Sequence, residues 1–424
     1  MTINDPYFKK FIKMKNLSKS TELNYSNVIK YFTEANNITF TDFIKKIKSQ
    51  QYDYIQDNRI IRYDPEFSDI SVYLDTFIET VQKNGASNIT INGYLTKLKA
   101  ILNFFDIQLP RFPELADDTR DWYPLTKEEI KYIISISDIT YKAIILFLTT
   151  TGVRRTDLVN FTIEDFMKAT NDYHNYTNVY EFIDHAPQGM IPFFDFYPQK
   201  TKRHNIECKV CCTPECSDMV LLMLRERKQT MKKLYPELTI KKEDKLFSTK
   251  RKHYKESMKP STVTNVFYHK QIKLMQERRR VLDYKMINNE ISKEVHDSLL
   301  HEEPRFSPHA LRKYFITTVA ENVGNLRVCA LMEGHAPPMG LDRNYVRISD
   351  ELVKNEYLKV IPPLSFKDVK VDFLTSKRKK ELEDEIRELK EENHEIRKNI
   401  HDEAKKAVND LLYEYFPEKK VNKF

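Results

Sequence analysis

The chain has 424 residues, 41% of them hydrophobic, which suits a globular protein of two or three domains and excludes a disordered or fibrous one. Its net charge of +7 is modest. Lys and Arg nevertheless gather in runs at 200–203, 250–255, 277–280 and 377–380, which favour an anionic polymer as partner, although solvated faces carry such runs about equally often. The longest apolar run, residues 143–148, is too short for a bilayer, so we expect an intracellular, cytoplasmic protein without membrane contact.

The first block, residues 1–110, is predicted to be a small helical domain. Seven glycines in the whole chain are few, as expected of a mainly helical protein. Apolar residues at helical spacing mark residues 20–36, with Ser20 or Thr21 as the N-cap, and again residues 86–105. Residues 111–122 lie in a proline-containing stretch without periodicity, and we interpret them as a linker.

The middle block, residues 123–365, is predicted to be helical around a small sheet. Thr126 and Glu129 have capping-box spacing and start a helix. Aromatic and β-branched residues with Gly and Pro breaks give residues 178–213 a strand-like pattern. The fold class expected from both blocks is mainly α with a small β-sheet.

The third block, residues 366–424, has a heptad pattern. Its apolar seam, with one Asn, consists of Leu382, Ile386, Leu389, Asn393, Ile396 and Ile400. Because a buried Asn in a seam favours two-stranded pairing, we expect a C-terminal coiled-coil helix that joins protomers. A single amphipathic helix packed on the body of the protein would show the same seam, since the pattern spans only about three heptads.

Seven polar residues of the middle block stand out by spacing or by a position beside a predicted helix break: Arg154, Asp157, Lys200, His309, Arg312, His335 and Tyr345. Arg154 precedes Asp157 by three positions, so that on a helix the two side chains share a face and can pair. His309 and Arg312 repeat this spacing. Taken singly, each residue is more often a surface or core-edge side chain than a functional group.

The order of these residues is more specific. The segments "TTGVRRTDL", "PHALRKYFIT", "LMEGHAPP" and "NYVRIS" follow one another along the chain, and together they resemble the motifs of the tyrosine recombinases, or phage-type integrases. The resemblance covers nearly the whole chain. It implies an N-terminal helical core-binding domain at 1–110 and a mixed α/β catalytic domain at 123–365, with the coiled-coil tail at 366–424.

The resemblance also implies roles for individual residues. The expected catalytic set is Arg154, Lys200, His309, Arg312, His335 and Tyr345, with Asp157 in support. Lys202 is an alternative to Lys200 in the segment "KTKR". Tyr357 is an alternative nucleophile, because the interval from His335 to Tyr345 is one residue longer than is usual in the family.

The chemistry implied is cleavage of a phosphodiester without metal or nucleotide cofactor. A tyrosine phenol can conserve the bond energy as a 3′-phosphotyrosyl ester. Two arginines and a histidine meet the charge on the phosphoryl oxygens, and a lysine protonates the departing 5′-hydroxyl. The expected partners are a specific site on double-stranded DNA and further copies of the chain, as a tetramer on DNA.

Other functions and one other site remain open at this stage. A type IB topoisomerase or hairpin telomere resolvase uses the same chemistry, and a non-catalytic DNA-binding protein can retain a recombinase fold. Cys208, Cys211, Cys212 and Cys216 have spacings that a zinc ion could use. We favour packing thiols, since neighbouring strand residues point to opposite faces.

Overall fold

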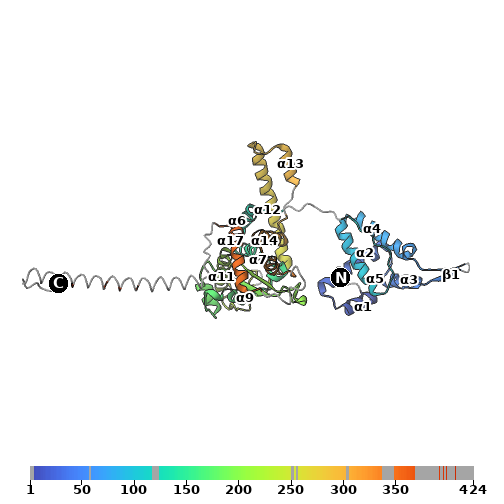
Figure 1. Cartoon of the computed structure of the whole chain (residues 1–424), viewed down its shortest axis with the longest axis horizontal. Coiled ribbons are helices and arrows are strands. Elements are labelled where there is room, and N and C mark those ends of the chain that lie inside the picture. Colours follow the sequence, from blue (N-terminus) through green and yellow to red (C-terminus); the bar gives the residue numbers. More distant parts are fainter. Residues whose placement is uncertain are drawn as a thin grey trace, which may run out of the picture. The chain divides into compact units, whose positions relative to one another are not determined.

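The computed structural model describes residues 4–56, 59–116, 124–249, 253–254, 256–301, 305–336 and 348–367, together with positions 391, 395, 398 and 406. These residues are mainly helical and contain two small antiparallel sheets, which confirms the predicted fold class at this level. The chain forms two compact units, residues 1–121 and 122–424 (Figure 1). Every position of the predicted heptad seam lies outside the described residues, as does Tyr345.

The first unit consists of helices packed around a single apolar core. Its elements are α1 (Pro6–Lys15), α2 (Lys19–Asn36), α3 (Phe40–Gln50), β1 (Tyr54–Gln56), β2 (Arg59–Ile61), η1 (Pro65–Phe67), α4 (Asp69–Lys83) and α5 (Asn88–Phe104). Phe32 lies near the centre of this core, with its ring centroid 4.8 Å from that of Phe43 and 5.6 Å from that of Phe77. Aromatic pairs at such distances stabilise a core beyond the area they bury.

Two details of this unit differ from the sequence predictions. The N-cap of α2 is Ser18, whose hydroxyl accepts from the amide of Thr21, so the helix starts before the predicted cap at Ser20 or Thr21. Strands β1 and β2 pair in antiparallel register, with Tyr54 opposite Ile61, in a block expected to be helical throughout. Short runs of aromatic and β-branched residues form these strands, and such runs are too short to be recognised by periodicity.

The second unit contains one large core and most of the helices. Its elements are α6 (Lys127–Ser135), α7 (Ile139–Thr151), α8 (Arg155–Leu158), α9 (Ile163–Ala169), η2 (Asn171–Tyr173), α10 (Val179–His185), β3 (Phe193–Phe196), η3 (Lys202–His204), β4 (Cys208–Cys211), α11 (Pro214–Leu234), α12 (Pro260–Ile287), α13 (Lys293–His301), α14 (Pro308–Asn322), α15 (Leu326–Glu333) and α17 (Asp350–Leu364). The capping box predicted at Thr126 and Glu129 is present at the start of α6.

Helix α7 is the central helix of this unit. All residues from 143 to 151 are buried, and the helix packs against α11 and α14. It ends at Gly152, which adopts a left-handed conformation with φ of 60°. A Cβ atom at this position would lie 2.1 Å from the ring of Phe315, so that only glycine fits where α7 meets α14.

The strand-like interpretation of residues 178–213 is correct only in part. Residues 179–185 form helix α10, because the side chain of Asn178 accepts from the amides of Tyr180 and Glu181 and caps a helix there. The strands are confined to β3 and β4, which pair antiparallel with Phe193 opposite Cys211. Apolar Val179, Phe182 and Ile183 have the spacing of a helix face, which the aromatic and β-branched composition concealed.

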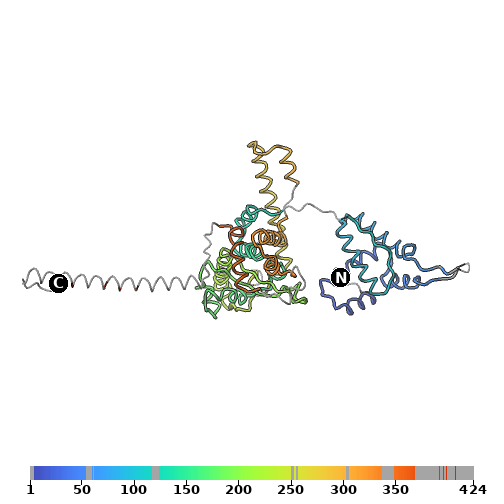
Figure 2. Tube along the Cα trace, in the orientation of Figure 1, coloured from blue at the N-terminus to red at the C-terminus, as the bar shows by residue number. Residues whose placement is uncertain are grey.

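Helices α12 and α13 form a hairpin that projects from the body of the second unit (Figures 1 and 2). The His296 imidazole lies between the two helices, with Nε2 2.9 Å from Asp283 Oδ1 and Nδ1 3.0 Å from Asp297 Oδ1. At the base of the hairpin, Arg278 contacts Glu129 of α6 at 3.4 Å. The side chains of His296 and Arg278 therefore join α12 to α13, the latter by donating to the carbonyl oxygen of Leu299, and Arg278 attaches the hairpin to the body.

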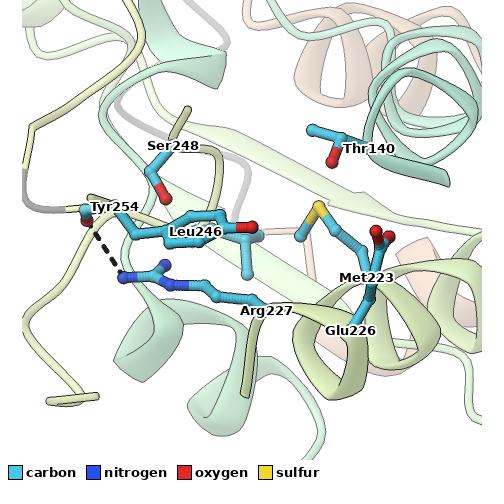
Figure 3. A pocket seen from close by; sticks show the side chains of 7 residues that line it. All are labelled: Thr140, Met223, Glu226, Arg227, Leu246, Ser248 and Tyr254. Atoms are coloured by element: carbon cyan, nitrogen blue, oxygen red, sulfur yellow. Dashed lines mark hydrogen bonds between the residues drawn. The ribbon is translucent and has the colours of Figure 1, made fainter. Parts of the chain in front are cut away.

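A buried arginine fixes the segment that leads into α12. Arg227 of α11 donates to the backbone carbonyls of Lys245 and Tyr254 and forms an ion pair with Asp244 at 3.2 Å. Figure 3 shows this guanidinium beneath the Tyr254 ring, beside a cavity of about 10 Å³, which is room for about one water molecule. Burial lowers the pKa of Arg227, and the charge of Asp244 opposes that shift.

No helix among the residues described is both long enough and apolar enough to cross a bilayer.

Candidate active site

Arg154 lies at the junction between α7 and α8. Gly152 ends α7, and Arg154 is the N-cap residue of α8, with an extended backbone. Its Nη2 atom donates to the carbonyl oxygen of Gly334 at 3.3 Å, across 180 positions of sequence. Arg154 is partly buried, and this hydrogen bond directs its guanidinium towards the end of α15.

Arg312 reaches the same place from α14. Ser307 caps this helix by accepting from the amide of Ala310, and Pro308 occupies its first turn. Arg312 is 5% exposed, and its two terminal nitrogens donate to the carbonyl oxygens of Gly152 and Glu333, at 2.5 Å each. Both carbonyls lie at helix C-termini, where unpaired acceptors and the helix dipole favour a cation.

Burial, followed by the charge of Arg154, lowers the pKa of Arg312 to about 10. The side chain therefore remains protonated at neutral pH. Two guanidinium groups that repel each other are held in one small region by backbone acceptors. An anion placed between them would relieve that repulsion.

His335 follows the C-terminus of α15. Gly334 ends this helix with φ of 60°, and a Cβ atom there would approach Pro198 at 3.0 Å and Cys208 at 3.1 Å. The His335 Nε2 atom lies 3.0 Å from Arg312 Nη2, and Nδ1 lies 2.7 Å from a carboxylate oxygen of Glu333. The glycine thus turns the chain so that the imidazole meets Arg312.

Asp157 connects α8 to the segment between β3 and β4. It is 5% exposed, and its Oδ1 atom accepts from the amide of Gln199 at 2.9 Å. Burial raises the pKa of this carboxyl, while the Gln199 amide and the charges of Arg154 and Arg312 act in the opposite direction.

The ion pair that the sequence suggested between Arg154 and Asp157 is absent among the described contacts, and Asp157 Oδ2 has no hydrogen-bond partner there. Arg154 instead donates to the carbonyl oxygen of Gly334, and Asp157 accepts from the amide of Gln199, although the charge of Arg154 still acts on the Asp157 carboxyl.

The two candidate lysines differ in position. Lys200 lies in the connection between β3 and β4 and is exposed, whereas Lys202 begins the exposed turn η3. The pKa of His309, on the first turn of α14, is lowered by partial burial and by the charges of Lys313, Arg312 and Lys200. The charge of Lys200 therefore lies close enough to His309 to act on its ring.

The two candidate nucleophiles also differ. Tyr345 lies outside the described residues. Tyr357 is fully buried in α17, its hydroxyl donates to the carbonyl oxygen of Thr150 at 2.6 Å, and burial raises its pKa well above the usual range. A phenol so placed packs in the core and does not face solvent.

The five cysteines are free thiols, and all are buried. Burial raises the pKa of Cys208 and of Cys211 to about 12. Among the described residues no group of His, Cys, Asp and Glu side chains is arranged to hold a metal ion.

The geometry brings Arg154, Arg312 and His335 together where α7 and α15 end, and the charges of Asp157, His309 and Lys200 lie near enough to interact with this cluster or with one another. Planar guanidinium groups and an imidazole in one cluster suit an oxyanion such as a phosphoryl group. Glu333 also belongs to the cluster, through its carbonyl and its carboxylate, and was not among the residues predicted from sequence. Its place two residues before His335 is no signal by itself, because the contact depends on how the His335 ring is oriented.

Comparison with known proteins gives structural similarity alone. No protein-family model and no curated protein matches the chain. The crystal structure of XerA recombinase has 18% sequence identity, covers 83% of this chain and 96% of its own, and has a TM-score of 0.32. The Tn1549 transposon integrase in complex with transposon right end DNA has 17% identity, covers 82% and 96%, and has a TM-score of 0.46. The XerH recombinase bound to its difH substrate has 15% identity, covers 84% and 96%, and has a TM-score of 0.42.

Proposed function

We propose that this chain is a tyrosine-type site-specific DNA recombinase, which cleaves and rejoins double-stranded DNA through a 3′-phosphotyrosyl intermediate. The observation that carries the proposal is the convergence of Arg154, Arg312 and His335 from three separate elements into one cluster. The motif order along the sequence, from the first arginine to the tyrosine, gives independent support.

Each residue has a chemical role in this proposal. Tyr345 attacks the phosphorus and forms the covalent ester, while Arg154 and Arg312 stabilise the charge on the phosphoryl oxygens. Lys200 protonates the departing 5′-hydroxyl, and His309 assists in proton transfer or in placing the phosphate. Asp157 holds the β3–β4 connection, which carries Lys200, through the amide of Gln199. Attack by a 5′-hydroxyl of a partner strand reverses the first step and completes strand exchange.

The proposal extends to how the chain binds DNA and how its copies assemble. The first unit is proposed to bind DNA together with the second, and four copies of the chain to act on two DNA sites. The tail at 366–424 would join protomers through its heptads. Integration or excision of a mobile element is the process that such an activity would serve.

A trapping experiment tests the proposal without knowledge of the target sequence. Nicked duplexes with a randomised central region lose the short fragment after cleavage, so that a covalent protein–DNA adduct accumulates. We expect the wild-type chain to yield adducts that resist denaturing electrophoresis and that enrich one sequence over successive rounds. Tyr345→Phe lacks only the attacking oxygen, and we expect it to bind the enriched DNA without forming the adduct.

A second assay separates recombination from relaxation. Two DNAs that carry the enriched sequence should be joined into recombinant products by the wild-type chain. Relaxation of a supercoiled plasmid without that sequence, together with no recombinant product, would instead indicate a topoisomerase. Failure of the wild-type chain to form any adduct in the pool would reject strand cleavage altogether.

A further inference from the structure

Glu333 makes a contact that none of the assigned roles requires. Its side chain is 12% exposed, while that of His335 is 47% exposed, and Glu333 Oε2 lies 2.7 Å from His335 Nδ1. The backbone carbonyl of the same residue accepts from Arg312. One residue therefore contacts both the arginine and the histidine of the cluster, each through a different group.

The donors and acceptors around His335 permit one tautomer. An arginine side chain carries only donors, so the Nε2 atom, 3.0 Å from Arg312 Nη2, must accept a hydrogen bond. An ionised carboxylate only accepts, so the Nδ1 atom must donate to Glu333. In this state the ring is neutral, with its proton on Nδ1 and the lone pair of Nε2 directed at Arg312.

This arrangement fixes where the reactive nitrogen points. The left-handed turn at Gly334 sets the backbone, and the Glu333 carboxylate sets the rotation of the ring, so that Nε2 faces the Arg312 guanidinium. A histidine held by a carboxylate at one nitrogen is oriented at the other, as in other sites where a carboxylate supports a functional imidazole.

We propose that Glu333 is a positioning residue, which holds His335 in the Nδ1-protonated form and directs its Nε2 atom at the phosphate-binding region. The consequence for catalysis rests on the proposed recombinase function, whereas the tautomer itself does not. When a phosphoryl group lies between Arg154 and Arg312, the ring takes up a second proton from solvent at Nε2 and donates to a phosphoryl oxygen. The carboxylate at Nδ1 stabilises that charge.

The first test uses the free full-length chain and does not depend on activity. With ¹⁵N-labelled histidine, long-range ¹H–¹⁵N correlation distinguishes a protonated ring nitrogen from an unprotonated one, and His335→Gln identifies the signal of His335 among the eleven histidines. We expect a protonated Nδ1 and an unprotonated Nε2 in the wild-type chain. The reverse assignment would overturn the proposal.

Two variants of Glu333 separate hydrogen bonding from packing. Glu333→Gln retains an acceptor for the Nδ1 proton, so we expect the same tautomer and a cleavage rate within about tenfold of wild type. Glu333→Leu removes the acceptor, so we expect mixed tautomers and cleavage that is slower by about 10- to 100-fold, as is typical when an orienting carboxylate is lost. Binding of the enriched DNA and the thermal midpoint of each variant serve as controls for folding.

A double-mutant cycle shows whether Glu333 acts through His335. In the His335→Ala background, Glu333→Leu should cause no further loss of cleavage, because the ring that it orients is gone. An equal loss in both backgrounds would mean that Glu333 acts through Arg312 or through packing, and would overturn the proposal. If the wild-type chain forms no adduct at all, the recombinase function fails, and the tautomer measurement still decides the position of the proton.

Discussion

The arginine cluster and the α12–α13 hairpin differ in the acceptors that hold most of their charged side chains. In the cluster, Arg312 is anchored by backbone carbonyls at the ends of two helices. In the hairpin, His296 contacts two carboxylates, and Arg278 contacts the Glu129 carboxylate as well as the carbonyl oxygen of Leu299. Backbone acceptors do not titrate and move only when a helix moves, whereas side-chain pairs change with pH and salt. The first arrangement suits a preorganised site, and the second suits an attachment that can loosen.

The largest expected effect comes from removing a guanidinium from the cluster. Arg312→Ala should leave binding of the enriched DNA largely intact and slow cleavage by orders of magnitude, since loss of one fixed donor to a developing charge costs about 3 to 4 kcal/mol. Single-turnover cleavage on nicked duplexes measures this. Near-normal cleavage by Arg312→Ala would remove the arginine from the mechanism. Arg203→Ala, in the exposed turn η3, is a matched control for loss of one positive charge.

A second variant tests how much the close approach of Gly152, at the end of α7, to the Phe315 ring contributes to the stability of the fold. Gly152→Ala places a Cβ atom against the Phe315 ring at a left-handed position, which we expect to lower the free energy of unfolding by about 2 to 5 kcal/mol from strain and overpacking together. Gly189→Ala is the control, because Gly189 also has positive φ, of 77°, but a Cβ atom there meets nothing within 4 Å. It should lose only about 1 to 2 kcal/mol. Equal losses in urea denaturation would show that the contact with Phe315 is unimportant.

A third variant separates the core tyrosine from the proposed nucleophile. Tyr357→Phe leaves the Thr150 carbonyl without its donor, which should cost about 1 to 2 kcal/mol of stability, while adduct formation continues. The measurements are chemical denaturation and mass spectrometry of the adduct. Loss of the adduct in Tyr357→Phe, with Tyr345→Phe still active, would exchange the roles of the two tyrosines.

The smallest effect is expected in the hairpin, and it depends on pH. Hydrogen bonds that the His296 ring donates to Asp297 and Asp283 raise the pKa of His296, so the protonated ring is favoured in the folded chain. The contribution to stability is complete below the ordinary pKa of histidine and is lost as pH rises through the raised value. The opening free energy of α13, obtained from hydrogen exchange after correction for the intrinsic pH dependence of amide exchange, should therefore fall over that range, and His296→Gln should remove that fall. Cleavage should be insensitive to this substitution.

The sequence indicated which residues form the cluster, but it did not indicate which atoms they contact. Arg154, Arg312 and His335 were found from local motifs, and the structure places them together. Their acceptors are carbonyl oxygens, which every residue carries, so no residue type signals them. The pairing that the spacing allowed between Arg154 and Asp157 is not formed among the described contacts, because Arg154 donates to the Gly334 carbonyl oxygen and Asp157 accepts from the Gln199 amide. Glu333 was missed because a carboxylate next to a Gly-His pair has no meaning until the ring is placed.

The fold was predictable to a similar degree. The capping box of α6 depends on side chains a few residues apart, and the sequence displayed it. Helix α10 was mistaken for a strand because seven residues give less than two clear turns of periodicity. Two features make this segment a helix: the Asn178 cap and the burial of Val179, Phe182 and Ile183 in the core. The burial depends on the tertiary structure and cannot be read from the segment alone.

The anchoring of Arg312 has a consequence for how the chain is made. Its guanidinium bonds to a carbonyl 160 positions earlier, and Arg154 bonds to one 180 positions later, so the cluster has high contact order. During synthesis the first unit emerges and can fold well before α14 and α15 leave the ribosome. We therefore expect incomplete chains to lack any ability to cut DNA, even where they already fold in part. Under the proposed function, competence to cleave DNA would then appear only after α14 and α15 have emerged and packed.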